Sequence, residues 1–170
     1  MSDKSDYDVY NPNFWKKRVS EAIARDRLHE AVFFASEGQF LEHTVGKRDF
    51  LIRTIRKTET VLEIGCGYGR FHDLYPEYRG RYLGIDISPD LIEQARIRHP
   101  DQTFMVADMQ TFDASKYDWV VAMGVRNMVR NFISEKAWEN IEEKYRKVCT
   151  KGMLITSLPL VEPPFILSPL

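Results

Sequence analysis

The chain has 170 residues, 44% of them apolar and 12% aromatic, which is enough for a single domain whose core needs no disulfide or structural metal. Its 24 lysines and arginines nearly balance 25 aspartates and glutamates, so a main role in gripping nucleic acid is unsupported. Cys66 and Cys149 stand far apart and lack the spacing of a zinc site or a disulfide framework, so no metal is predicted.

The sequence contains no segment typical of export or membrane insertion. Its first 14 residues hold no apolar signal region, and the longest uncharged apolar run, Trp119 to Val125, is far shorter than the ~20 residues a membrane helix needs. We therefore expect a cytoplasmic protein without a membrane partner.

Residues 1–59 are predicted to form a helical N-terminal segment that could act as a lid. Residues 11–13 (Asn-Pro-Asn) are typical of a helix start, and apolar residues recur at helical spacing from Trp15 onward. A second apolar stretch over 28–40 is expected to be helical and broken by Gly38, and a third helix is expected over 47–57. These helices precede the part of the chain that carries the motifs.

After residue 60, short apolar runs alternate with helical patterns. The expected strands are Thr60–Ile64, Tyr82–Ile85, Thr103–Ala107, Tyr117–Met123 and Met153–Ser157. The expected helices follow Gly69 as far as Pro76, run from Pro89 to Arg98 after the N-cap Ser88, and run from Glu135 to Val148 after the N-cap Ser134. This alternation predicts an open α/β sheet of mostly parallel strands, whose ligands bind at the carboxyl ends of the strands.

The strongest motif is a glycine-rich loop between the first strand and the next helix. Residues 61–70 read VLEIGCGYGR, in which an apolar strand runs into GxGxG. Glycine suits a loop that a ligand approaches closely or that requires positive φ. The spacing departs from the dinucleotide fingerprint GxGxxG because Arg70 stands where that pattern has Gly or Ala, and no GK[ST] follows to make a phosphate-binding loop.

Two aspartates at the ends of later strands strengthen the interpretation of that loop. Asp86 ends the strand over 82–85, where a carboxylate could accept hydrogen bonds from both hydroxyls of a ribose. Asp108 follows the strand over 103–107, although it could instead cap a short helix. Carboxylates gathered at one edge of an apolar sheet are costly to bury without a partner, so a ligand is the natural explanation.

Residues 61–157 resemble a class I S-adenosylmethionine-dependent methyltransferase. VLEIGCGYGR resembles the first motif of that family, YLGIDISPDLIEQAR the second strand and helix, FMVADM the third, YDWVVAMGV the fourth and KGMLITS the fifth strand. The resemblance implies a Rossmann-like, doubly wound sheet in the order 3-2-1-4-5, preceded by N-terminal helices. It also implies a shortened C-terminal end, since residues 158–170 form only a proline-rich apolar tail with room for one edge strand at 165–167.

The family's cofactor, S-adenosylmethionine, which leaves as S-adenosylhomocysteine, would be held by residues that match the family's motifs or by aromatic residues of the N-terminal segment. These are Glu63, Gly65, Cys66, Gly67, Gly69, Asp86, Ile87, Asp108, Met109, Met123, Tyr10 and Trp15. The resemblance places the methionine portion against the loop, the ribose at Asp86 and the adenine at Asp108. Cys66 is expected to fill space in the loop rather than act as a nucleophile.

No catalytic residue can be assigned from the sequence, although three are candidates. Arg126 and Asn127 follow the fourth strand and could orient an anionic or carbonyl-bearing acceptor, while His72 could serve as a base or be an ordinary helix residue. Methyl transfer by in-line displacement mainly requires that the acceptor be positioned and water excluded. A general base is needed only for an acceptor that is protonated at the working pH.

We therefore expect a methyltransferase that acts on a small-molecule acceptor. The alternatives are a noncatalytic cofactor-binding subunit that activates a partner, suggested by the short C-terminal end, and a nicotinamide or nucleotide-sugar oxidoreductase of similar sheet topology. An open edge at the C-terminal end of the sheet would favour association with another copy or another protein.

Overall fold

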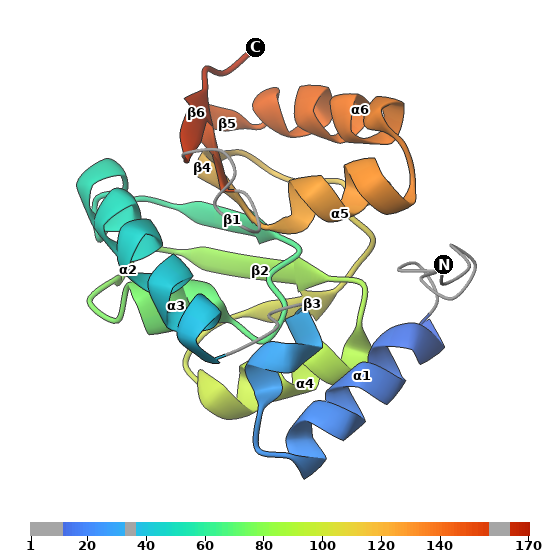
Figure 1. The fold of residues 1–170 in the computed structure, drawn as a ribbon. Helices are drawn as coiled ribbons and strands as arrows, with labels where there is room; N and C mark the ends of the chain where they lie inside the picture. Colours follow the sequence, from blue (N-terminus) through green and yellow to red (C-terminus); the bar gives the residue numbers. More distant parts are fainter. Residues whose placement is uncertain (1–11, 33–36, 157–163) are drawn as a thin grey trace.

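Six strands form one sheet in the order β3-β2-β1-β4-β5-β6 in a computed structural model, which describes residues 12–32, 37–156 and 164–170 (Figure 1). The strands are β1 (Val61–Ile64), β2 (Tyr82–Asp86), β3 (Phe104–Val106), β4 (Tyr117–Met123), β5 (Cys149–Thr156) and β6 (Phe165–Leu167). All neighbours pair in parallel except β5 and β6, which are antiparallel. The predicted α/β fold is confirmed, and β6 extends the predicted order of five strands.

Helices cover both faces of this sheet. They are α1 (Pro12–Ala24), the 3-10 helix η2 (Leu28–Val32), α2 (Glu37–Thr54), α3 (Arg70–Leu74), α4 (Pro89–Arg98), α5 (Val125–Phe132) and α6 (Glu135–Arg146). Apolar residues of α2, α3 and α4 pack on one face, and those of α5 and α6 pack on the other (Figure 1). In the parts of the chain that the structure describes, no helix has the length and apolarity needed to cross a membrane.

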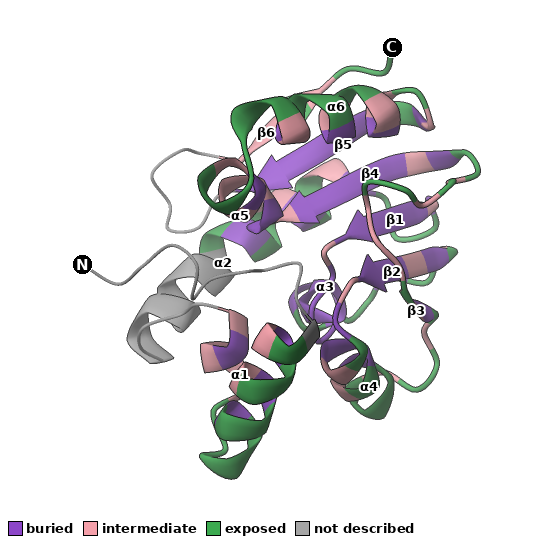
Figure 2. Ribbon diagram, turned by 90° about the vertical axis from the view of Figure 1, so that its right-hand side faces the viewer, coloured by how far each residue is buried: buried purple, intermediate pink, exposed green. Residues whose placement is uncertain are grey.

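The apolar runs of the central strands are explained by burial on both faces (Figure 2). In β1, Leu62 and Ile64 belong to the core under α5 and α6, while Val61 faces the core under α2 and α3. Glu63 occupies the same face as Val61 and is also buried, at 1% exposure. Both faces of β1 pack against apolar cores, so neither face is polar. Glu63 is therefore an exceptional buried carboxylate within an apolar strand.

Helix starts that the sequence indicates by a serine are confirmed by the side-chain contacts. The Ser88 hydroxyl accepts a hydrogen bond from the backbone N–H of Leu91 at 3.2 Å, and the Ser134 hydroxyl accepts one from Ala137 at 3.0 Å. Each serine satisfies one of the N–H groups that the first turn of a helix leaves without a partner.

Two predicted boundaries are wrong. Helix α2 begins at Glu37, so Gly38 lies in its first turn rather than at a break, and the helix starts well before the one predicted over 47–57. Strand β5 begins at Cys149 rather than Met153, because Thr150 and Lys151 reach polar partners at the bottom of the sheet. The end predicted for this strand, Ser157, lies outside the described residues.

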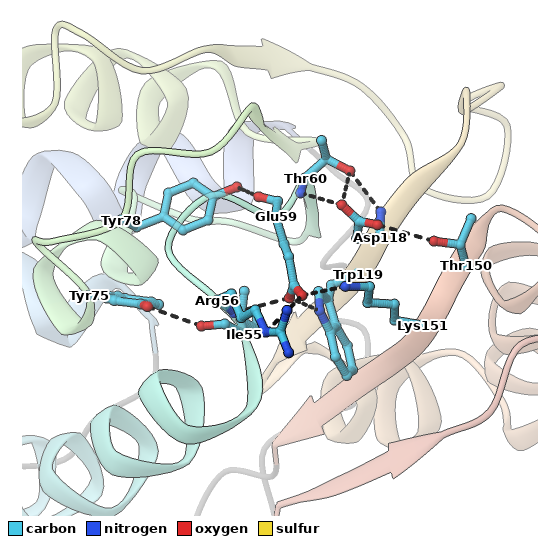
Figure 3. A network of polar contacts seen from close by, with 10 residues as sticks. All are labelled: Ile55, Arg56, Glu59, Thr60, Tyr75, Tyr78, Asp118, Trp119, Thr150 and Lys151. Atoms are coloured by element: carbon cyan, nitrogen blue, oxygen red, sulfur yellow. Dashed lines mark hydrogen bonds and ion pairs between the residues drawn. The ribbon is translucent and has the colours of Figure 1, made fainter.

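Glu59 and Asp118, the partners of Lys151 and Thr150, belong to a polar network at the amino ends of β1, β4 and β5 (Figure 3). The Glu59 carboxylate accepts hydrogen bonds from the indole N–H of Trp119 at 2.6 Å and the backbone N–H of Arg56 at 3.0 Å, and it pairs with Lys151. Burial raises the pKa of Glu59, but the bonds from Lys151, Arg56 and Trp119 outweigh it and hold this pKa below its usual value.

Asp118 joins the same strands from β4. Its Oδ2 accepts bonds from the backbone N–H and the hydroxyl of Thr60, at 2.8 and 3.1 Å, and its Oδ1 accepts one from the Thr150 hydroxyl at 3.3 Å (Figure 3). These bonds, led by the one from the Thr60 N–H, lower the pKa of Asp118. The amino edge of the sheet is therefore held by carboxylates whose acceptor atoms are used within the protein.

We expect Glu59→Gln to lower the free energy of unfolding by about 1–2 kcal/mol at pH 7, because the hydrogen bonds to Glu59 lose their charge. The pKa of Glu59 is lower in the folded chain than its ordinary value of 4.5, so its stabilisation is present above pH 4.5 and is lost as the pH falls through the folded value. Urea unfolding of both proteins at several pH values measures the difference.

The exposed ion pair between Glu139 and Lys136 provides the control, because Glu139→Gln should change stability by no more than about 0.5 kcal/mol. Equal stability of Glu59→Gln and the unmodified chain at pH 7, or a difference that grows on acidification, would contradict this account of the network.

Candidate functional site

A pocket of about 690 Å³, including solvent at its mouth, lies at the carboxyl ends of the central strands. The loop after β1 and the ends of β2 and β4 form part of its wall. The residues after β3, the end of η2 and the helices α1, α4 and α5 form the rest. The lining residues are Trp15, Val32, Gly65, Gly67, Asp86, Ile87, Leu91, Asp108, Met109, Met123, Gly124, Val125, Met128, Val129 and Ile133. This is the edge of the sheet where the sequence predicts a ligand.

The loop after β1 can follow its path only because it is built from glycine. Gly65 and Gly67 have φ of 66° and 55°, in the left-handed region that other residues rarely adopt. A Cβ atom at Gly65 would stand 2.8 Å from a methyl carbon of Val125, the first residue of α5. The bare backbone thus lets the loop close against α5 while remaining part of the pocket wall.

Asp86 fixes this loop in place. Its Oδ2 accepts a hydrogen bond from the Gly67 N–H at 2.9 Å, and its Oδ1 accepts one from the Ser88 N–H at 2.9 Å. Burial raises the pKa of Asp86, and these bonds only partly oppose the shift. Because each carboxylate oxygen can accept more than one bond, Asp86 retains acceptor capacity on the side that faces the pocket.

Asp108 accepts hydrogen bonds within the turn that follows it and also lines the pocket. Its Oδ1 accepts a bond from the Gln110 N–H at 2.8 Å, and its carbonyl accepts one from Phe112 at 2.8 Å. No helix follows Asp108 in the described residues before β4, so it closes a turn here rather than capping the short helix that the sequence leaves open as an alternative. The same residue is among those lining the pocket, next to Met109, so the two roles are compatible.

A smaller pocket adjoins the first and shares Val32, Gly65, Gly67 and Met123 with it. Glu63, Cys66 and Arg70 line this second pocket. Burial raises the pKa of Glu63 to about 8, although the hydroxyl of Tyr82 donates to its Oε2, and this shift favours the protonated form at neutral pH. Burial also raises the pKa of the Cys66 thiol, which leaves this group a poor nucleophile.

Helix α5 contributes much of the pocket wall and is not among the helices that the sequence predicts. Val125, Met128 and Val129 line the pocket, and their spacing of i, i+3 and i+4 places them on one face of the helix. That spacing is the feature of the sequence from which this helix could have been predicted. Polar residues at 126, 127 and 130 interrupt the apolar run, so the segment resembles a loop that carries acceptor-binding residues.

The three catalytic candidates are not among the residues that line this pocket. The Arg126 guanidinium lies 5.2 Å from the ring centre of Phe165 in β6, and Asn127 lies beside it on α5. His72 packs edge-on against Tyr82, with ring centres 4.3 Å apart, and lines a separate cleft. Burial lowers the pKa of His72 to about 4, so its ring is neutral at physiological pH. Their catalytic roles stay predictions.

The residues proposed to hold the cofactor are largely brought together. Those lining the main pocket are Trp15, Gly65, Gly67, Asp86, Ile87, Asp108, Met109 and Met123, while Glu63 and Cys66 line the adjoining one. Gly69 belongs to neither pocket and packs against His99 and Phe104. Tyr10 lies outside the described residues. Within the described residues, no three His, Cys, Asp or Glu side chains are grouped to hold a metal ion.

Comparison with known proteins gives a consistent result. A family model described as a methyltransferase domain matches residues 62–156, which is more than half of the chain. A malonyl-[acyl-carrier protein] O-methyltransferase from Anoxybacillus flavithermus is 32% identical over 115 residues, covering 63% of this chain and 39% of the relative. A trans-aconitate 2-methyltransferase from Afipia carboxidovorans is 37% identical over 71 residues, covering 40% of this chain and 28% of the relative. The chain thus spans well under half the length of these relatives.

Solved structures share the fold at low sequence identity. A TehB-like S-adenosylmethionine-dependent methyltransferase from Corynebacterium glutamicum superposes with a TM-score of 0.60 at 20% identity, covering 85% of this chain and 73% of its own. A magnesium protoporphyrin IX methyltransferase from Synechocystis, solved with bound S-adenosylmethionine, superposes with a TM-score of 0.62 at 14% identity. The match covers 85% of this chain and 75% of the Synechocystis chain.

The geometry of the loop predicts the effect of Gly65→Ala. We expect a loss of about 2 kcal/mol or more in the free energy of unfolding, because alanine is strained at positive φ and its Cβ would press on Val125. Thermal and urea unfolding measure the change.

Gly46→Ala is the matched control, because Gly46 is exposed within α2 and a Cβ atom added there would meet nothing within 4 Å apart from the adjacent residues and backbone of its own helix. This change should stabilise the chain by up to about 1 kcal/mol. If the two substitutions had the same effect, the loop would not be under the constraint described.

Proposed function

The chain belongs to the methyltransferase domain family, and from this premise we propose that it transfers a methyl group from S-adenosylmethionine to a small-molecule acceptor by in-line displacement. The observation that carries the proposal is that the glycine loop, Asp86 and Asp108, from three successive strands, line one pocket. Trans-aconitate, named in one relative, is a small molecule, which supports an acceptor of that size.

The residues present fit this cofactor. Gly65 and Gly67 line the pocket without side chains, so a ligand can lie against their backbone. Asp86 suits the two adjacent hydroxyls of a ribose, since its carboxylate is buried, fixed by backbone bonds and still able to accept. Asp108 and Met109 would hold the adenine between polar and apolar groups. The cofactor supplies a methyl group on a positively charged sulfur, which is already electrophilic.

The chain's own contribution is to position the acceptor and exclude water. Met123, at the end of β4, and Val125 and Met128, on α5, form an apolar wall beside the glycine loop. Water is poorly accommodated against such a surface. Holding two reactants in line can lower a barrier by about 7–11 kcal/mol in favourable cases. No proton transfer by a residue of this wall is part of the proposal.

The test uses two ligands and one pair of variants. S-adenosylhomocysteine at about 100 times its Kd should raise the free energy of unfolding by roughly 2.7 kcal/mol, and NAD at the same concentration should not. Asp86→Asn should weaken S-adenosylhomocysteine binding by about tenfold or more, because hydrogen bonds to a charged acceptor are lost. Titration calorimetry and thermal unfolding provide the measurements.

Asp113→Asn changes the same group at an exposed position and should leave binding unchanged. Stabilisation by NAD without stabilisation by S-adenosylhomocysteine would refute the proposal and favour an oxidoreductase.

A further inference from the structure

The charged groups that line the main pocket lie on one side of it. Among the described residues that line it, the two charged ones are Asp86, at the end of β2, and Asp108, which follows β3. The opposite side, at β4 and α5, is lined by Met123, Val125 and Met128 together with Val129 and Ile133. If the proposed function holds, on which this inference rests, the two aspartates serve the adenosine, and the apolar side remains for the acceptor.

The orientation of α5 keeps its charges away from that side. Arg126 lies over the ring of Phe165, and Arg130 pairs with Glu135 at the start of α6. The face of α5 that lines the pocket carries only aliphatic and thioether groups, and Ile133 continues it past the end of the helix. The apolar face of this amphipathic helix therefore lines the pocket as well as packing on the core.

Positive charge is absent from this wall among the described residues, although Arg70 lines the adjoining pocket, which shares Met123 with it. Among the described residues, none of those lining the pocket is a lysine or an arginine. Residues 1–12, 33–45 and 157–163, whose side chains are not described, contain one lysine, Lys4, and no arginine. An acceptor bearing several negative charges would therefore bury them against methyl and thioether groups with few partners, which is strongly unfavourable.

We infer that the acceptor presents an uncharged hydrocarbon body to the wall formed by Met123, Val125, Met128, Val129 and Ile133. Acceptors of this class differ from trans-aconitate, the triply acidic compound named in one relative. The three methionines that line the pocket, at 109, 123 and 128, add flexible and polarisable contacts that adapt to such a body. Arg126 and Asn127, proposed from the sequence as acceptor-binding residues, have no part in this recognition.

The test measures binding of two probe acids to the chain saturated with S-adenosylhomocysteine. Octanoate carries one carboxylate on a hydrocarbon body, whereas trans-aconitate carries three carboxylates on a short one, so the comparison sets an apolar acceptor against a highly charged one. Titration calorimetry should give a Kd for octanoate at least about tenfold lower than for trans-aconitate, a difference that the burial of two methylene groups would account for. Equal or tighter binding of trans-aconitate, or no binding of octanoate, would overturn the inference.

A pair of α5 variants locates the effect. Met128→Gln keeps the side chain's length but places an amide on the apolar wall, and should weaken octanoate binding about fivefold or more while leaving S-adenosylhomocysteine affinity within about twofold. Arg130→Gln, on the other side of the helix, should change neither. Unaltered octanoate binding in Met128→Gln would also overturn the inference. Failure of the unmodified chain to bind S-adenosylhomocysteine would instead refute the proposed function.

Discussion

Two backbone amides, those of Gly67 and Ser88, donate hydrogen bonds to the carboxylate of Asp86, and the form of the pocket depends on this pair of bonds. One joins the glycine loop after β1 to the end of β2, and the other joins the same carboxylate to the start of α4. The loop can accept this position only with positive φ at Gly65 and Gly67, and it closes against Val125 of α5. A single side chain therefore links three elements that border the pocket.

The carboxylates at the two ends of the sheet have pKa values shifted in opposite directions. At the amino ends of the strands, Glu59 and Asp118 receive several hydrogen bonds from neighbouring strands, and their pKa values fall below the usual range. At the carboxyl ends, burial is the larger effect, and the pKa values of Asp86 and Glu63 rise. The amino end thus satisfies its charges internally and stabilises the fold. Desolvated acids that line a pocket are typical of a site that binds a ligand.

Much of this arrangement could be predicted from the sequence because its signals are local. The alternation of strands and helices, the glycines at 65 and 67, and the aspartates that end two strands all lie within short segments, and parallel pairing then brings them to one edge. Helix α5 could not be recognised in the same way, because its apolar residues face a pocket while arginines interrupt them in sequence. The early start of β5 depends on Glu59 and Asp118, which are distant in the chain. Tertiary contacts of this kind leave no local pattern.

The central claim is that the adenosine end of the cofactor lies at β2 and β3 and the reacting end faces β4 and α5. A crystal structure of the chain with S-adenosylhomocysteine tests it most directly. The account predicts the ribose hydroxyls within hydrogen-bond distance of Asp86, the adenine beside Asp108 and Met109, and the sulfur directed toward Met123 and Val125. A ligand bound in the separate cleft lined by His72 and Asp73, or bound with its adenine against α5, would contradict it.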